Sequence, residues 1–209
     1  MDQVGRKPIL LSKVLEGRRG SRRESIGLIG AHHGAGVTYT GLLLAFYMGE
    51  ELGKKTIFLE CNSHHDMELM QAAYEWSRED SSSFTFGNVT IFKDIGPQRL
   101  PEVIGDDYDC CILDFGTDFL TNKEEFLRCG TKIILGGQGE WNRQKLLQFI
   151  RSMQSARGSN TWIHLIPCAG QKVINSLKSE AGRAFYAVPY EADPTMPSKG
   201  TARLFDILL

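Results

Sequence analysis

The sequence predicts a single three-layer α/β domain, in which a doubly wound, mainly parallel sheet lies between two layers of helices. Short strands that are apolar throughout alternate with helical segments from residue 25 onward, which is typical of a parallel sheet covered on both faces. The first strand leads into a glycine-rich turn and then a helix, the layout of a phosphate-binding loop. A length of 209 residues with 42% hydrophobic residues suits one compact domain.

The elements follow from the apolar pattern in chain order. Residues 25–30 (Ser-Ile-Gly-Leu-Ile-Gly) form the first strand, and the next helix, 37–53, carries the apolar set Leu42, Leu43, Leu44, Ala45, Phe46 and Met48. Further strands are expected at residues 55–61, 89–92, 109–114, 131–135, 161–166 and 184–188. Further helices are expected at 66–78, 123–129, 142–156, 171–180 and 199–209, with a serine-rich loop at 79–86 and a turn with a short helix at 97–105.

Composition limits the classes of partner. A net charge of -1 and a pI near 6.5 argue against nucleic-acid binding by the whole domain. Five cysteines without short regular spacing indicate reduced thiols and a cytoplasmic protein. No apolar stretch approaches the roughly 20 residues of a membrane span, so no transmembrane segment is expected.

Residues 1–24 differ from the body of the chain, which we expect to be one P-loop-like domain at 25–209. Seven basic residues outnumber three acidic ones there, and a small apolar group lies among them: Ile9, Leu10, Leu11, Val14 and Leu15. The segment is expected to be a short helix or tail packed on the domain. The alternative is a segment that docks a partner or an anionic surface, which leaves peripheral membrane association open through residues 1–24.

The loop after the first strand is the strongest functional signal. Residues 30–40 are Gly-Ala-His-His-Gly-Ala-Gly-Val-Thr-Tyr-Thr. Against the pattern G-x-x-x-x-G-K-[ST], Gly36 and Thr38 are kept, whereas Ala31 replaces the first glycine and Val37 replaces the lysine. Small residues let successive backbone N–H groups form an anion nest, and the following helix adds its dipole. The loop is therefore expected either to bind phosphate without a lysine or to be a turn that binds nothing.

Acidic residues end two of the apolar strands. Glu60-Cys61-Asn62 closes the second strand, and Asp114, followed two residues later by Gly116, closes the strand at 109–114. A carboxylate at the position of Asp114 is the usual Walker-B arrangement and can hold a water molecule of Mg²⁺. The Thr38 hydroxyl can ligate the same ion. The alternative role for Asp114 is to cap the turn that follows.

These motifs resemble the MinD/ParA-type ATPases, the deviant Walker-A branch of the P-loop fold, over roughly residues 25–209. The family loop K-G-G-x-G-K-[ST] aligns with residues 32–38, so the signature lysine is His32 and the loop lysine is Val37. The family's D-x-D at the second strand is Glu60-Cys61-Asn62, so its second carboxylate has become an amide. Asp114 matches the Walker-B aspartate, and the segment beginning Val188-Pro189 resembles the last strand and its proline-containing loop near the adenine.

The resemblance implies a nucleotide site with its catalytic residues partly removed. The implied contacts are His32, His33, Gly34, Ala35, Gly36, Val37, Thr38, Tyr39, Glu60, Asn62, Asp114 and Pro189, with Thr38 and Asp114 on Mg²⁺ and no residue assigned to catalysis. Loss of both lysines should remove transition-state stabilisation on the order of several kcal/mol. ATP or ADP with Mg²⁺ is then bound without efficient hydrolysis, or no cofactor is bound.

Several functions stay open at this stage. The leading one is a pseudo-ATPase scaffold in regulation, assembly or localisation, similar to degenerate CpaE/TadZ-like bacterial members, with protein partners that include a second copy of the chain. The alternatives are an active ATPase whose basic residues come from Arg18–Arg23 or a dimer partner, and a pure interaction module with a dead pocket. A zinc site formed by the pairs at residues 32–33 and 64–65 with Cys61 or Asp66 is a further alternative.

Overall fold

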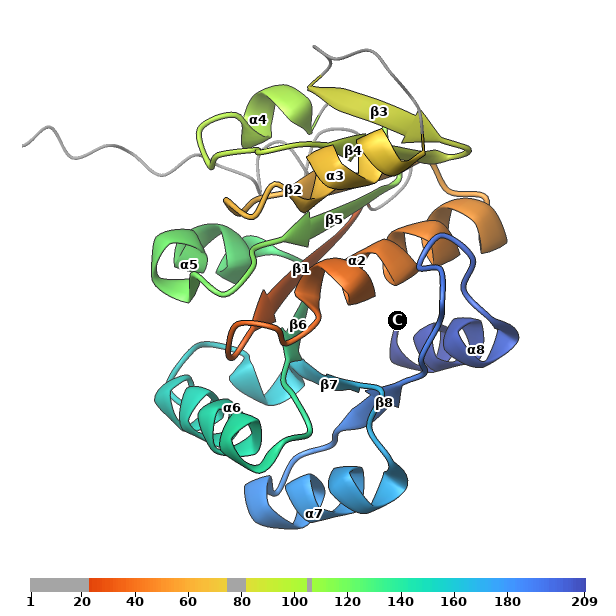
Figure 1. Cartoon of the computed structure of the whole chain (residues 1–209). Helices are drawn as coiled ribbons and strands as arrows, with labels where there is room; N and C mark the ends of the chain where they lie inside the picture. Colours follow the sequence, from red (N-terminus) through yellow and green to blue (C-terminus); the bar gives the residue numbers. More distant parts are fainter. Residues whose placement is uncertain (1–22, 75–81, 105–106) are drawn as a thin grey trace, which may run out of the picture.

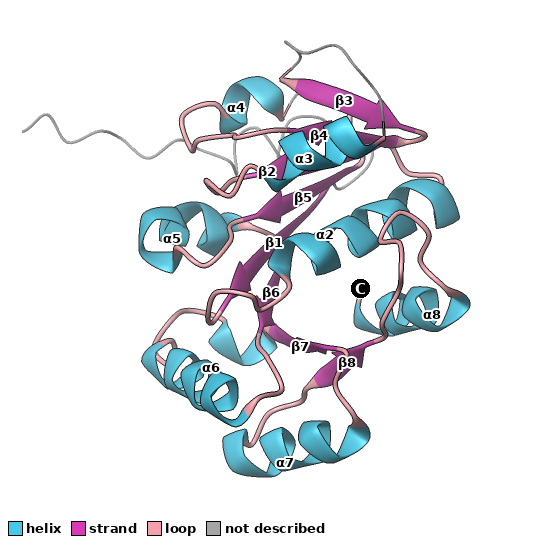
Figure 2. Ribbon diagram, in the orientation of Figure 1, coloured by secondary structure: helices cyan, strands magenta, loops and turns pink. Residues whose placement is uncertain are grey.

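A computed structural model describes residues 23–74, 82–104 and 107–209 (Figure 1). Most of the basic segment, residues 1–22, lies outside the described residues, so the domain boundary stays a prediction. The described part is an eight-stranded sheet between two layers of helices (Figure 2). The predicted fold class, a doubly wound and mainly parallel α/β domain, is confirmed.

The sheet has the strand order β3-β4-β2-β5-β1-β6-β7-β8. All neighbouring strands are parallel except β3 and β4, which form an antiparallel pair at one edge. The central strands β1, β2 and β5 are buried almost throughout, which explains why their sequences are apolar without alternation. The strands span β1 Glu24–Gly30, β2 Thr56–Glu60, β3 Ser83–Phe86, β4 Val89–Phe92, β5 Cys110–Asp114, β6 Thr131–Leu135, β7 Ile163–Pro167 and β8 Tyr186–Val188.

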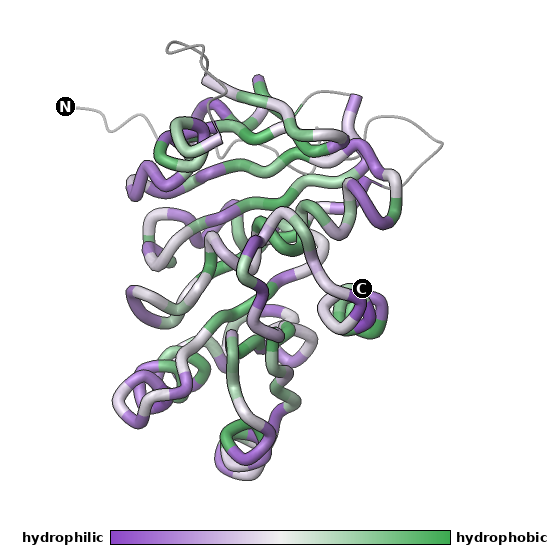
Figure 3. Tube along the Cα trace, turned by 45° about the vertical axis from the view of Figure 1, so that its right-hand side comes forward, coloured by the Kyte–Doolittle hydropathy of each residue, from purple (hydrophilic) through white to green (hydrophobic). Residues whose placement is uncertain are grey.

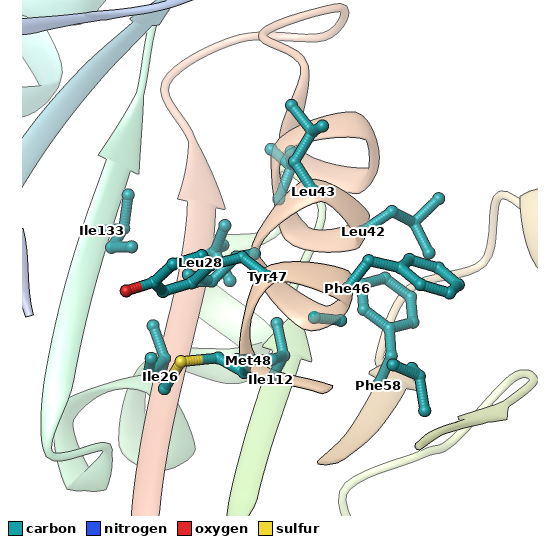
Figure 4. Packing of buried hydrophobic residues seen from close by; sticks show 14 of the residues in the cluster. Ile26, Leu28, Leu42, Leu43, Phe46, Tyr47, Met48, Phe58, Ile112 and Ile133 are labelled. Carbon is teal, nitrogen blue, oxygen red and sulfur yellow. The ribbon is translucent and has the colours of Figure 1, made fainter. Parts of the chain in front are cut away.

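Each face of the sheet carries its own helices and its own core. One face is covered by α2 (Val37–Phe46), α3 (Asp66–Ala73) and α8 (Lys199–Leu208), whose apolar side chains pack in one cluster. Figure 4 shows the part of this cluster formed by α2, the turn that follows it and the strands beneath. The other face is covered by α4 (Leu100–Val103), α5 (Phe119–Arg128), α6 (Glu140–Ser152) and α7 (Gln171–Ala181). The apolar stretches coincide with the interior strands, as Figure 3 shows. The loop between β1 and α2 thus begins at the centre of the sheet and is supported by packed side chains on both faces.

Two segments differ from the sequence-based expectation. Residues 83–86, expected to be loop, form β3, because Ser-Phe-Thr-Phe alternates and pairs with β4 across a turn in which Gly87 has a φ of 56°. The helix expected at 37–53 is α-helical only to Phe46 and continues as a π-turn, η1 (Tyr47–Glu51), with the Leu52 N–H bonded to the Tyr47 carbonyl at 3.2 Å. The expected helix at 66–78 ends at Ala73 within the described residues.

The five cysteines, all described, are free thiols. Cys61, Cys110, Cys111 and Cys129 are buried, and burial raises the pKa of each, to about 12 for Cys110 and Cys129. Cys168 alone is exposed. No helix in the described ranges is long and apolar enough to cross a membrane.

Packing at Gly27 gives a test of the core. A Cβ at this position of β1 would lie 2.8 Å from Cys129 Sγ and 3.1 Å from the Phe115 ring. Gly27→Ala should therefore lower the free energy of unfolding by about 1–3 kcal/mol. Gly96→Ala is the matched control, because a Cβ there meets nothing within 4 Å. Urea unfolding of both variants measures the difference, and equal stability of the two would contradict the packing argument.

Candidate nucleotide site

The phosphate-type loop lies between β1 and α2, at the carboxyl edge of the sheet. Gly34 and Gly36 both take left-handed backbone conformations, with φ values of 75° and 83°, which a side chain would strain. Helix α2 begins directly after Gly36, with no side-chain cap and no acidic residue in its first turn. The loop therefore offers backbone amides and a helix N-terminus to an anion.

A cavity of about 600 Å³ opens at this loop. It is lined by His33, Gly34, Ala35, Gly36, Val37, Thr38, Tyr39, Ser63, His64, Asp66, Gly116 and Thr117. Seven of the twelve predicted site residues line it: the run from His33 to Tyr39 forms one wall. Among the residues that the structure describes, neither a lysine nor an arginine lines the cavity.

Thr38 lines the cavity and is hydrogen-bonded to Asp114, which is buried behind it and is not among the lining residues. The Thr38 hydroxyl donates to Asp114 Oδ2 at 2.7 Å and lies 3.5 Å from Asp66 Oδ2. Asp114 Oδ1 accepts the N–H of Gly116 at 2.9 Å, so the carboxylate is held on both oxygens. Two carboxylates and a hydroxyl at one point form a donor set of the kind that Mg²⁺ prefers.

The carboxyl group of Asp114 is fully buried. Burial is the main reason that its pKa rises to about 6, although the hydrogen bonds from Thr38 and Gly116 favour the ionised form. Glu60 adds a smaller repulsion that raises the pKa further. The ionised carboxylate is thus in an unfavourable environment at neutral pH, which a nearby cation would relieve.

Val37, at the position of the family's loop lysine, is packed into the core and only 6% exposed. A Cβ on Gly30 would lie 2.9 Å from Val37 Cγ2 and 3.0 Å from Ala35 Cβ, so both side chains fill the space beneath the loop. At this position the chain therefore has an apolar contact inside the fold and no charge.

The two loop histidines have different surroundings. His33 lines the cavity, and its ring lies edge to face with that of His64, with centroids 5.5 Å apart. His32 is buried and is not among the lining residues: its Nδ1 bonds to the His33 carbonyl at 2.8 Å, and its Nε2 has no hydrogen-bond partner in the described structure. Its ring packs beside Gly137, where a Cβ would be 3.0 Å away. Of the two, only His33 is placed to contact a phosphate.

Glu60 and Asn62 position loops and do not line the cavity. Glu60 is fully buried, and its two oxygens accept the N–H groups of Met67 at 3.1 Å and Asp94 at 3.2 Å. Asn62 donates to the Asp114 carbonyl at 3.3 Å and accepts the His64 N–H at 3.0 Å. The structure therefore places both predicted switch residues behind the cavity wall, where they fix the chain that presents the lining residues His64 and Asp66.

Tyr39 joins the loop to the segment after β8. Its hydroxyl donates to the Glu191 carbonyl at 3.0 Å and accepts the Glu191 N–H at 2.6 Å. Pro189 lies half-buried just after β8, outside the lining set of the cavity. The tyrosine thus fixes the proline-containing segment near the first turn of α2.

Ser63, His64, Asp66 and Thr117 line the cavity but are absent from the predicted site. The signal for them is their place after β2 and β5, since parallel strands present these connections at one edge. The zinc alternative has no support, because no group of three or more His, Cys, Asp or Glu residues in the described ranges could hold a metal ion.

Comparisons with known proteins agree with this geometry. Neither a protein-family model nor a curated protein matches the chain. Solved structures do, including MinD complexed with Mg-ADP from Pyrococcus horikoshii OT3, at 14% identity over 89% of this chain and 94% of that one, with a TM-score of 0.62.

A ParA family ATPase from Chlorobium tepidum TLS matches at 14% identity over 81% of this chain and 84% of that chain, with a TM-score of 0.61. A plasmid partition protein from Borrelia burgdorferi B31 bound to AMPPNP matches at 12% identity over 89% of this chain and 96% of that chain, with a TM-score of 0.60. At these identities the likeness concerns the fold. The chain therefore has the fold of the MinD/ParA ATPases.

Proposed function

We propose that the protein is a degenerate MinD/ParA-like nucleotide switch, which binds Mg²⁺ with ATP or ADP, hydrolyses ATP little or not at all, and works as a regulatory, assembly or localisation scaffold. One combination of features at the cavity carries this proposal. A phosphate-type loop and Thr38, bonded to Asp114, are present, whereas no lysine or arginine among the described residues lines the cavity.

The site fits binding better than turnover. Backbone amides, the α2 dipole and His33 can hold phosphate, and Thr38 with Asp114 can hold the metal ion that accompanies it. Phosphoryl transfer also needs positive charge placed on the developing transition state, and the burial of Val37 leaves none there from the loop. The solved structures with bound Mg-ADP and AMPPNP support nucleotide as the ligand class.

A bound nucleotide would contact the connections that follow three strands of the sheet. The cavity wall includes the connections after β1, β2 and β5, and Tyr39 links it to the segment after β8. Ordering these connections is the physical basis of a switch, because it alters the surface that a protein partner or a second copy meets. Residues 1–24 are a second candidate surface for a partner.

Two alternatives predict different outcomes. An active ATPase would need basic residues supplied by Arg18–Arg23 or by a dimer partner. An interaction module with a dead pocket would bind no nucleotide and dock through residues 1–24, so deleting them would spare folding and lose the partner.

Nucleotide binding should stabilise the fold through Thr38. At about 100 times its Kd, Mg-ATP adds roughly 2.7 kcal/mol, about 6 °C in the melting temperature of a domain of this size. Thr38→Ala should abolish the shift, whereas Thr38→Ser keeps the hydroxyl and should retain it. A thermal-shift titration with Mg-ATP, Mg-ADP and EDTA measures this, and identical curves with and without nucleotide would leave only the dead-pocket module.

Asp114 should make stability depend on pH. Its folded-state pKa is raised from 3.8 to about 6, so its contribution to the free energy of unfolding is greatest below about pH 4 and is lost as the pH rises to about 6. The total loss is on the order of 3 kcal/mol. Asp114→Asn removes this dependence, so the variant should gain stability relative to the wild type across that interval. Urea unfolding at a series of pH values measures the difference; a constant difference would mean that the carboxyl titrates normally.

Phosphate release decides between the switch and the ATPase. We expect wild-type protein with Mg-ATP to release phosphate no faster than Asp114→Ala, because the cavity lacks a lysine. A coupled phosphate assay at saturating nucleotide makes the comparison. Release that is fast in the wild type and absent in the variant would establish the ATPase and reject the switch without turnover.

A further inference from the structure

A second cavity, of about 720 Å³, lies at the opposite edge of the sheet from the phosphate-type loop. Its lining includes Ile163 and Tyr186, the first residues of β7 and β8, whereas the loop follows the last residue of the parallel strand β1. The rest of the wall comes from the connections before these strands and from the last turn of α8; Figure 1 shows α7 and α8 on either side of β8. Nothing in the nucleotide switch uses this space.

The lining is rich in hydrogen-bond donors and has no carboxylate. It consists of Gln154, Asn160, Thr161, Trp162, Ile163, His164, Ala181, Gly182, Arg183, Ala184, Tyr186, Ile207 and Leu208. The chain has 25 acidic residues, yet Arg183 is the one charged side chain among these thirteen apart from the titratable His164. The neighbouring acids are engaged elsewhere: Glu180 lies 3.3 Å from Arg143, and Asp206 accepts the Tyr47 hydroxyl.

Arg183 is half-buried and held in place by one hydrogen bond. Its Nη1 donates to the Ser159 carbonyl at 2.6 Å, and within the described ranges its other N–H groups have no hydrogen-bond partner. A guanidinium fixed on one side and open on the other presents a planar fork of donors, the geometry that binds a carboxylate or phosphate with two hydrogen bonds.

One further side chain beside Arg183 favours an acceptor, whereas His164 adds no positive charge. Burial, assisted by the charge of Arg183, lowers the pKa of His164 to about 4, and its ring is already hydrogen-bonded to the Ala184 backbone. Trp162 is only 6% exposed, and its Nε1–H has no acceptor in the described structure. A small space of about 10 Å³, lined by Ile134, Phe149, Ile150, Met153 and Ser159 as well, shares Trp162, His164 and Arg183 with the cavity and is about the least volume that holds one water molecule. An oxyanion, directly or through such a water, supplies the acceptor that this buried donor lacks.

The outer wall is apolar. Ile207 is 69% exposed and Leu208 partly so, on the last turn of α8, and half-buried Tyr186 contributes from the start of β8. An apolar group of a ligand would cover these side chains while its charged end meets Arg183. We propose that this cavity binds a small amphiphilic oxyanion, a carboxylate or phosphate monoester on an apolar body.

The indole N–H of Trp162 gives a direct measurement. The full chain labelled with ¹⁵N-tryptophan shows three indole resonances, and Trp162→Phe identifies the one that belongs to the cavity. Titration with phenyl phosphate or benzoate should move that resonance to saturation, whereas benzyl alcohol should not. Comparing the two anions distinguishes a phosphate from a carboxylate ligand. Failure of both anions to move it, or an equal response to the alcohol, would overturn the proposal.

Charge variants test the recognition without disturbing the core. Ile207→Glu adds a negative charge at an exposed rim position and should weaken binding of the better anion at least about tenfold, whereas Ile207→Gln, which loses only the apolar contact, should weaken it much less. Arg183→Gln should weaken it similarly, with an unchanged melting temperature as the criterion of folding. Equal affinity for all three variants and wild type would overturn the oxyanion assignment.

The same titration on Thr38→Ala separates this site from the nucleotide site. That variant removes the proposed metal ligand at the other edge of the sheet and should leave the Trp162 response unchanged. A Trp162 response that is lost with Thr38→Ala would place the anion at the phosphate-type loop and overturn the second site.

Discussion

The buried carboxylate of Asp114 is the constraint that organises the candidate site. It ends β5, which lies between β1 and β2, so the three connections that follow these strands must close around it. Thr38 satisfies one oxygen from the first turn of α2, the Gly116 amide satisfies the other, and Asn62 bonds to the same residue's carbonyl. The phosphate-type loop, the turn after β5 and the segment after β2 are therefore fixed relative to one another by a single residue whose charge is costly to bury.

The loop matches the family pattern at some positions and departs from it at others. The backbone conformation at Gly34 and Gly36 and the Thr38–Asp114 pair depend on the fold itself, since they sit between packed strands and a buried helix. The residue at the family's lysine position does not depend on the fold in this way. Here it is Val37, which packs in the core. The buried Val37 side chain adds apolar packing beneath the loop and places no charge at the cavity.

The sequence predicted the sheet well because β1, β2 and β5 each contain a short apolar run without alternation, which is typical of a buried parallel strand. It failed at β3, whose four residues depend on pairing with β4, and at η1, whose extra residue in the turn leaves no mark in the apolar pattern. Spacing singled out Thr38 and Asp114, whose role in a site stays a prediction although the structure joins them by a hydrogen bond. It could not show that His32 and Glu60 are buried or that His64 and Asp66 line the cavity. Side-chain direction at a loop is set by tertiary contacts, which a linear pattern does not contain.

The distribution of the cysteines has a practical consequence. Four thiols are buried with raised pKa values and so are poor nucleophiles, whereas Cys168 is exposed and follows Pro167, whose ring would lie 3.0 Å from a Cβ on Gly36. The natural sequence thus carries one accessible attachment point for a thiol-reactive fluorophore or spin label, directly behind the glycine turn. Conformational change at the loop can be followed by spectroscopy on this chain without first removing any other cysteine.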